Sequence, residues 1–192
     1  GSTSSVGGGF NNSAGSDYST VGGGSYNIAS GSNSVVPGGK SNTAGGQYSL
    51  ATGNRAKAIH AGTFVWGDAT DADFSSSNTN QFLIRANGGV GIGTNTPNSM
   101  LGIKYNSTNT PHILLMEDDN DYARLNFQNT ASSNRWSLGG NPNATDASSR
   151  FSIYYGGTSS SGDRMVITGD GNVGIGNSNP GNILTVQQSS ST

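Results

Sequence analysis

Small apolar and polar residues recur at fixed places in residues 4–58, with a period of fifteen. The stretch reads SSVGGGFNNSAGSDY, STVGGGSYNIASGSN and SVVPGGKSNTAGGQY, followed by SLATGNRAKA, which is a broken fourth copy. A short fixed period indicates that each unit is one coil of a stack. A unit of this length is too short for a helical hairpin, but it suits two short strands and two turns. The pattern therefore predicts a parallel β-solenoid with one coil per repeat.

Two pairs of columns in the repeat define the positions that we expect to face inward. The recurring columns are Ser4, Ser19, Ser34 and Ser49; Val6, Val21, Val36 and Ala51; Gly8, Gly23, Gly38 and Gly53; Asn12, Asn27 and Asn42; and Ala14, Ala29 and Ala44. The serine and valine columns are two residues apart, as are the asparagine and alanine columns, so each pair lies on one face of a strand. We expect the asparagines to form a ladder from coil to coil. The glycines mark sharp turns or positive φ.

Such a roll has a thin interior of Val, Ala and Ser. Each coil adds about 4.8 Å, so the repeats together form a slab under about 20 Å thick. Ordering each residue costs about 1–2 kcal/mol of conformational entropy. We therefore expect the roll to need burial against partner chains.

The repeated columns of residues 4–58 resemble the head repeats of the trimeric autotransporter adhesins (YadA-like heads), which also occur in bacteriophage tail fibres. The segment HAGTFVWGD at residues 60–68 resembles the closing segment of such heads. The resemblance implies a left-handed parallel β-roll assembled as a homotrimer.

Residues 63–104 change character and read as a capping and neck segment. Two apolar runs, TFVW at 63–66 and FLI at 82–84, flank an Asp-, Ser- and Asn-rich loop. We read these as a strand, an exposed loop and a strand. Because a solenoid needs its ends covered, we expect Phe64, Trp66 and Phe82 to seal the open end of the roll.

A second repeat has a long period. Residues 84–103 (IRANGGVGIGTNTPNSMLGI) align with residues 167–186 (ITGDGNVGIGNSNPGNILTV) at an offset of 83. Glycine alternating with Val or Ile lets backbones approach closely on one face while aliphatic side chains fill the other. The element resembles the GNVGIGT-type modules of phage tail fibres, where it separates globular modules along a trimeric shaft.

The remaining segment, residues 105–166, reads as a β-rich module. We expect strands at 112–116, 122–127, 136–138, 151–155 and 165–167, with an acidic turn at 117–121, because these runs are apolar or alternating and Gly, Asn and Ser lie between them. The chain is thus divided into 1–62, 63–104 and 105–192. The predicted fold is all-β: a trimeric left-handed parallel β-roll, a β-rich neck and an antiparallel β-sandwich.

Composition excludes several function classes. Charged residues make up only 10% of the chain, the net charge is −2, and 31 of the 192 residues are glycine. Without cysteine, no disulfide or thiol chemistry is possible. No apolar run is long enough to span a bilayer, and no clustered Lys or Arg indicates nucleic-acid binding. We expect no cofactor, because the glycine-rich 88–93 stretch lacks a phosphate-loop GKS/T.

Two groups of side chains are candidate sites. Glu117, Asp118, Asp119 and Asp121 offer the oxygens that calcium prefers, although an acidic turn in solvent is the commoner explanation; the same holds for Asp68, Asp71 and Asp73. Trp136, Tyr154, Tyr155 and Tyr122 are the best ligand-binding candidates, because aromatic faces beside polar groups suit sugars and protein surfaces. The competing reading places Trp136 and one tyrosine in a core.

These patterns predict a non-enzymatic protein, because no Ser–His–Asp set or paired carboxylates can be assigned. The expected role is a segment of an extracellular trimeric fibre, such as a phage tail fibre that attaches to a cell-surface glycan or protein. The alternatives are the passenger head of a bacterial trimeric autotransporter adhesin and a fibre spacer without a ligand.

Overall fold

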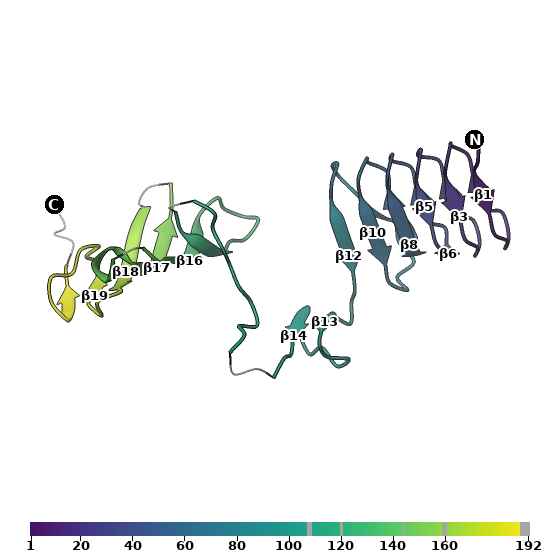
Figure 1. The fold of residues 1–192 in the computed structure, drawn as a ribbon. Helices are drawn as coiled ribbons and strands as arrows, with labels where there is room; N and C mark the ends of the chain where they lie inside the picture. Colours follow the sequence, from purple (N-terminus) through teal and green to yellow (C-terminus); the bar gives the residue numbers. More distant parts are fainter. Residues whose placement is uncertain (107–108, 120, 144, 159–160, 189–192) are drawn as a thin grey trace. The chain divides into compact units, whose positions relative to one another are not determined.

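The computed structural model describes residues 1–106, 109–119, 121–143, 145–158 and 161–188. The chain forms two compact units, residues 1–108 and 109–192. Both are built from β-strands (Figure 1), and the one helix in the described ranges is the short 3₁₀ turn η1 (Asp146–Ser148). Within the same ranges, no helix has the length and apolar character needed to cross a bilayer.

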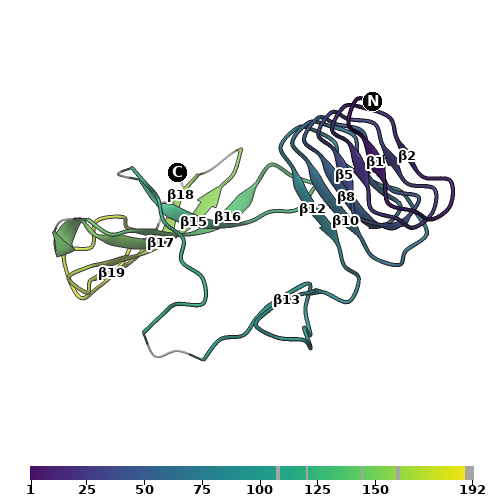
Figure 2. The same cartoon turned by 45° about the vertical axis from the view of Figure 1, so that its right-hand side comes forward.

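The N-terminal part of the first unit is a β-solenoid of stacked parallel coils. One sheet contains β1 (Ser5–Val6), β3 (Thr20–Val21), β5 (Val35–Val36), β8 (Leu50–Asn54), β10 (Phe64–Gly67) and β12 (Phe82–Arg85), and β6 (Gly39–Lys40) also pairs with β8. The opposite sheet contains β2 (Ser13–Ala14), β4 (Ile28–Ala29), β7 (Thr43–Ala44), β9 (Ala56–Ala58) and β11 (Phe74–Ser75). Figure 2 shows the coils stacked side by side, from the N-terminal coil at the right toward β12.

The register of the stack follows the sequence period. Thr20 pairs with Val35, fifteen residues on, whereas Leu50 pairs with Phe64, fourteen residues on. The fourth coil is therefore one residue shorter, and Gly53 lies beside Gly39 rather than in the column of Gly38. The positive-φ column is accordingly Gly9, Gly24, Gly39 and Gly53. The stack continues past residue 62 through β10 and β12.

The inward columns are the predicted ones. Val21, Val36, Ala51 and Val65 are fully buried from one sheet. Ala29, Ala44 and Ala58 are fully buried from the other, with Ser19, Ser34, Asn27 and Asn42 beside them. The interior consists of small side chains because two sheets of single coils lie too close together to hold larger ones.

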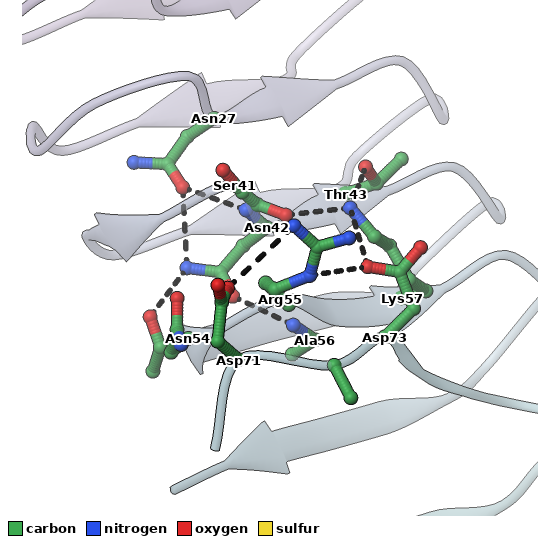
Figure 3. Close-up of polar contacts among 12 residues, drawn as sticks. Asn27, Ser41, Asn42, Thr43, Asn54, Arg55, Ala56, Lys57, Asp71 and Asp73 are labelled. Atoms are coloured by element: carbon green, nitrogen blue, oxygen red, sulfur yellow. Dashed lines mark hydrogen bonds and ion pairs between the residues drawn. The ribbon is translucent and has the colours of Figure 1, made fainter. Parts of the chain in front are cut away.

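The predicted asparagine ladder is present inside the roll (Figure 3). The backbone nitrogens of Asn27 and Asn42 each donate to Oδ1 of the asparagine one coil before. Nδ2 of Asn42 also donates to the backbone oxygens of Gly38 and Gly53, at 3.0 and 2.9 Å. The ladder ends where the backbone nitrogen of Ala56 donates to Oδ1 of Asn42 at 2.9 Å. Each buried amide thereby has partners for its polar atoms.

The bulky residues expected to seal the roll lie elsewhere. Val65 is the inward residue of β10, so Phe64 and Trp66 point to the outer face. Phe82 is 64% exposed, and its ring centroid lies 4.8 Å from that of Phe64. The expectation of an aromatic seal was wrong, because strand alternation directs these rings outward. Phe74 and Leu83 are the partly buried residues that pack against the core from the last coil.

Arg85 instead ties the last coils together. Its guanidinium donates to Oδ1 of Asp68 at 3.0 Å and to the backbone oxygens of Ala72 and Thr70 at 2.7 and 3.0 Å. Asp68 also accepts hydrogen bonds from the backbone nitrogens of Asn87 and Thr70. These bonds, led by the one from Asn87, hold the pKa of the Asp68 carboxyl well below its usual range.

The two copies of the long-period repeat adopt the same local structure. β13 (Val90–Ile92) pairs in parallel with β14 (Leu101–Ile103), and β19 (Val173–Ile175) pairs in parallel with β20 (Leu184–Val186) in the matching register. A Cβ atom on Gly174 would lie 2.1 Å from the backbone oxygen of Asn177, and one on Gly91 would lie 2.3 Å from that of Thr94. Glycine is required there because the strand and its loop touch, as the alternating pattern indicated.

The second unit contains one six-stranded sheet. Its strands, in spatial order, are β15 (Ala123–Phe127), β16 (Arg135–Asn141), β17 (Arg150–Gly156), β18 (Ser161–Thr168), β19 and β20. The strands predicted around 122–127, 136–138, 151–155 and 165–167 are confirmed. The strand predicted at 112–116 is wrong, because this segment pairs with no strand in the described part of the chain. The strands described here make a single sheet, and the expected sandwich would need a second layer.

Candidate functional site

The six-stranded sheet has two chemically different faces. Successive side chains along each strand point to opposite faces of the sheet. The register places polar residues beside polar ones and apolar residues beside apolar ones on neighbouring strands. Asn126 lies opposite Ser137, which lies opposite Tyr154, on one face. Phe127 lies opposite Trp136, which lies opposite Tyr155, on the other. One face is therefore polar and the other apolar.

The polar face contains a groove with a volume of about 600 Å³. Its lining includes Tyr122, Arg124, Asn126, Arg135, Tyr154 and Asp163. The volume is within the range of small-molecule sites, which is about 300–1,000 Å³.

The Tyr122 ring forms part of the groove wall. A Cβ atom on Gly139 would lie 3.0 Å from Cδ1 of Tyr122, so the absence of a side chain at Gly139 lets Tyr122 pack against the strand there. The Arg124 guanidinium lies 5.5 Å from the centroid of this ring and pairs with Asp121. Burial, followed by the nearby carboxylate of Asp163, raises the pKa of Tyr122. The phenol is therefore neutral at physiological pH and can donate a hydrogen bond.

The apolar face is uncovered by any other element of the described second unit. Its exposed side chains, each between 45% and 66% exposed, are Leu125, Phe127, Trp136, Phe151, Ile175, Leu184 and Val186. The rings of Trp136 and Tyr155 are 5.1 Å apart, and the Arg164 guanidinium lies 5.4 Å from the centroid of Tyr155. Exposed apolar patches of this kind are typical of surfaces that contact a protein, a membrane or a ligand.

The four aromatic residues singled out in the sequence therefore do not form one site. Tyr122 and Tyr154 lie in the polar groove, whereas Trp136 and Tyr155 lie on the opposite, apolar face. Sequence reasoning missed the polar residues of the groove, above all Arg135 and Asp163. The alternation Tyr-Ala-Arg-Leu-Asn-Phe-Gln at 122–128 carried the signal, because every second residue is polar.

The acidic candidates of the second unit are arranged as a turn. The backbone nitrogen of Asp118 donates to Oε1 of Glu117 at 3.1 Å, and that of Asp121 donates to the backbone oxygen of Asp119 at 2.8 Å. The Arg124 guanidinium, followed by the backbone nitrogen of Tyr122, lowers the pKa of Asp121. In the described ranges, no group of three or more His, Asp or Glu side chains is placed to hold a metal ion.

The acidic residues of the first unit pair with basic ones. Asp73 contacts both Arg55, at 2.9 Å, and Lys57, at 3.9 Å, while Asp71 lies 3.6 Å from Arg55 (Figure 3). Asp68 pairs with Arg85 at 3.0 Å. These carboxylates are neutralised by ion pairs between successive coils, so they connect the coils and do not present an open cation site.

No family model matches the sequence, and no curated protein matches it either.

Proposed function

We propose that this chain is a structural and attachment segment of a homotrimeric extracellular fibre. The fibre is a tail fibre of a phage or phage-like particle, and its ligand is a glycan or protein on a cell surface. The segment is not an enzyme and binds neither a cofactor nor nucleic acid. The roll is left-handed, as in the head repeats that residues 4–58 resemble.

The observation that carries the proposal is that both units leave apolar faces uncovered. In the second unit, the apolar face described above includes Phe127, Trp136 and Phe151, each at least 45% exposed. Burying such side chains contributes about 1.5–3 kcal/mol each. When copies associate through this face, the sheet of one copy covers the sheet of another. The predicted sandwich then forms between chains and not within one chain.

The solenoid has a matching apolar face. The outward residues of its longer sheet become larger toward the last coils, where Leu50, Phe64 and Phe82 follow one another in register. Trp66 and Ile84 lie on the same face and are 37% and 39% exposed. The outward positions of the opposite, five-stranded sheet are mostly polar. One side of the roll is thus suited to packing against other copies and the other side to solvent.

The test is the mass of the purified chain in solution, measured by light scattering. A trimer has three times the mass of one 19.5 kDa chain. A folded monomer at micromolar concentration would contradict the proposal, because the thin roll then needs no partner.

Two other functions remain candidates. The roll repeats alone favour the passenger head of a trimeric autotransporter adhesin, whereas the paired VGIG elements favour a fibre. The second of these two candidates is a fibre spacer without a ligand. Binding of the fluorescently tagged trimer to a panel of bacterial and animal cells separates attachment from a spacer, which binds none of them. The genes next to the coding sequence separate a virion fibre from an adhesin.

A further inference from the structure

The polar groove on the six-stranded sheet contains an arginine and a carboxylate that the chain itself does not use. In the part of the chain that the structure describes, the Arg135 guanidinium makes no ion pair or hydrogen bond, and neither does the Asp163 carboxylate. Arg124, by contrast, pairs with Asp121. The groove therefore offers one unpaired cation and one unpaired anion.

Arg135 is placed beside an aromatic ring. A Cβ atom on Gly156 would lie 3.4 Å from the guanidinium carbon of Arg135 and 3.2 Å from Cε1 of Tyr154. The missing side chain at Gly156 leaves space that these two groups share. A guanidinium near an aromatic ring forms a site with one charged group and one apolar wall.

These groups match the chemistry of a sugar that carries one carboxylate. A guanidinium binds a carboxylate through two parallel hydrogen bonds. The rings of Tyr122 and Tyr154 offer flat surfaces to the C–H face of a pyranose. Asp163 and Asn126 supply acceptors and donors for hydroxyl groups.

A highly charged polyanion fits less well. Such ligands are bound by clusters of Lys and Arg, whereas Arg135 is the unpaired cation of the described groove and the Asp163 carboxylate would repel additional negative charge. An extended sulfated chain or a nucleic acid is therefore disfavoured.

We propose that the groove formed by Tyr122, Asn126, Arg135, Tyr154 and Asp163 binds an acidic saccharide, with Arg135 pairing with the sugar carboxylate. This inference rests on the proposed attachment function and assigns its ligand class. The groove lies on the opposite side of the sheet from the apolar face. Copies that associate through the apolar face leave the groove open to solvent. Several grooves that bind one cell surface together give a higher overall affinity than a single groove.

The test is calorimetric titration of the full chain with two matched pairs of saccharides. The first pair is trigalacturonate and its methyl ester, and the second is sialyllactose and its methyl ester. Each pair keeps every hydroxyl group and differs only in the charge of the carboxylates. At least one acidic member is expected to bind at millimolar concentration, and about tenfold more tightly than its neutral partner, a difference of about 1.4 kcal/mol. No binding by either acidic sugar, or equal binding within each pair, would overturn the inference.

Variants locate the site. Arg135→Gln is expected to lower the affinity for the acidic member to that of its neutral partner, and Tyr154→Leu is expected to weaken binding of both members. Arg164→Gln is the matched control, because Arg164 lies beside Tyr155 and outside the groove. Circular dichroism melting confirms that each variant is folded. If the Arg135→Gln variant binds the acidic saccharide with the same affinity as the parent protein, the saccharide binds outside the groove.

The oligomeric state is measured on the same samples. A trimer that binds cells but no acidic sugar refutes the groove assignment alone. A monomer that binds no cells refutes the attachment fibre itself.

Discussion

Oδ1 of Asn27 accepts two hydrogen bonds from Asn42, one from its backbone nitrogen at 3.0 Å and one from its side-chain nitrogen at 3.1 Å. Both residues are fully buried. Nδ2 of Asn27 donates in turn to the backbone oxygens of Gly23 and Gly39, each at 2.9 Å. One buried side-chain amide thus joins two successive coils as both donor and acceptor, which a carboxylate of the same shape cannot do.

Asn27→Asp should destabilise the roll by about 2–4 kcal/mol, because it removes two donors and leaves a buried charge facing carbonyl oxygens. Thermal unfolding followed by circular dichroism measures the effect. Asn33→Asp is the control, since Asn33 is exposed and its side chain donates only to Ser32. If both variants melt at the same temperature, the ladder contributes nothing to stability.

Val21→Asp tests the assignment of inward columns. Val21 is fully buried between the sheets, so the new carboxylate has no partner or water and the cost should be at least about 3 kcal/mol. Ser13→Asp introduces the same residue at an exposed position of β2 and should change the melting temperature little. Comparable loss in both variants would contradict the assignment of Val21 to an inward column and Ser13 to an outward one.

Gly174→Ala tests the close approach within the second VGIG element. The added methyl group would lie 2.1 Å from the backbone oxygen of Asn177, and the displacement should cost about 1–3 kcal/mol. Gly181→Ala is the matched control, because nothing lies within 4 Å of the position of its new Cβ atom. Denaturant titration of the two variants compares them, and a stable Gly174→Ala protein would contradict the tight strand–loop contact.

Phe127→Lys and Gln128→Lys place the same charge on opposite faces of the six-stranded sheet. The first removes an apolar side chain that is 52% exposed in the single chain and should weaken association by about 1.5–3 kcal/mol per chain. The second lies at the polar groove and should leave the mass in solution unchanged. Sedimentation at several concentrations measures both, and trimers of equal stability would place the interface elsewhere.

Stability should fall in acid partly because of Asp68. Its pKa in the folded protein is lower than the value of about 3.9 in an unfolded chain, so its contribution is complete at neutral pH. This contribution diminishes as the pH falls below the unfolded value. Asp68→Asn should therefore be less stable than the parent at pH 7, and the difference should narrow toward pH 2.5. A constant difference across this range would mean that the carboxylate charge is not the relevant feature.

The repeat by itself determined the solenoid and its inward columns. Val21, Asn27, Ala29 and Ser19 recur every fifteen residues, and a stack has one way to place such columns inside. The close backbone approach at Gly91 and Gly174 was equally predictable, because glycine alternating with Val or Ile indicates it, whereas the parallel strand pairs themselves were not predicted. In all these cases the residues that form the pattern contact one another within neighbouring coils or one short loop.

Tertiary pairing alone decided which residues share the candidate site. Trp136 and Tyr155 lie next to Arg135 and Tyr154 in the chain, yet each neighbour points to the opposite face. Composition drew attention to aromatic residues. The groove instead depends on the register that brings Tyr122, which precedes β15, together with Arg135 of β16 and Asp163 of β18. The outward turn of Phe64 and Phe82 has the same origin, because the fully buried Val65 between the two aromatic residues of β10 sets which side chains face solvent. Alternation is a local property of the chain, but which face it buries depends on what packs against it.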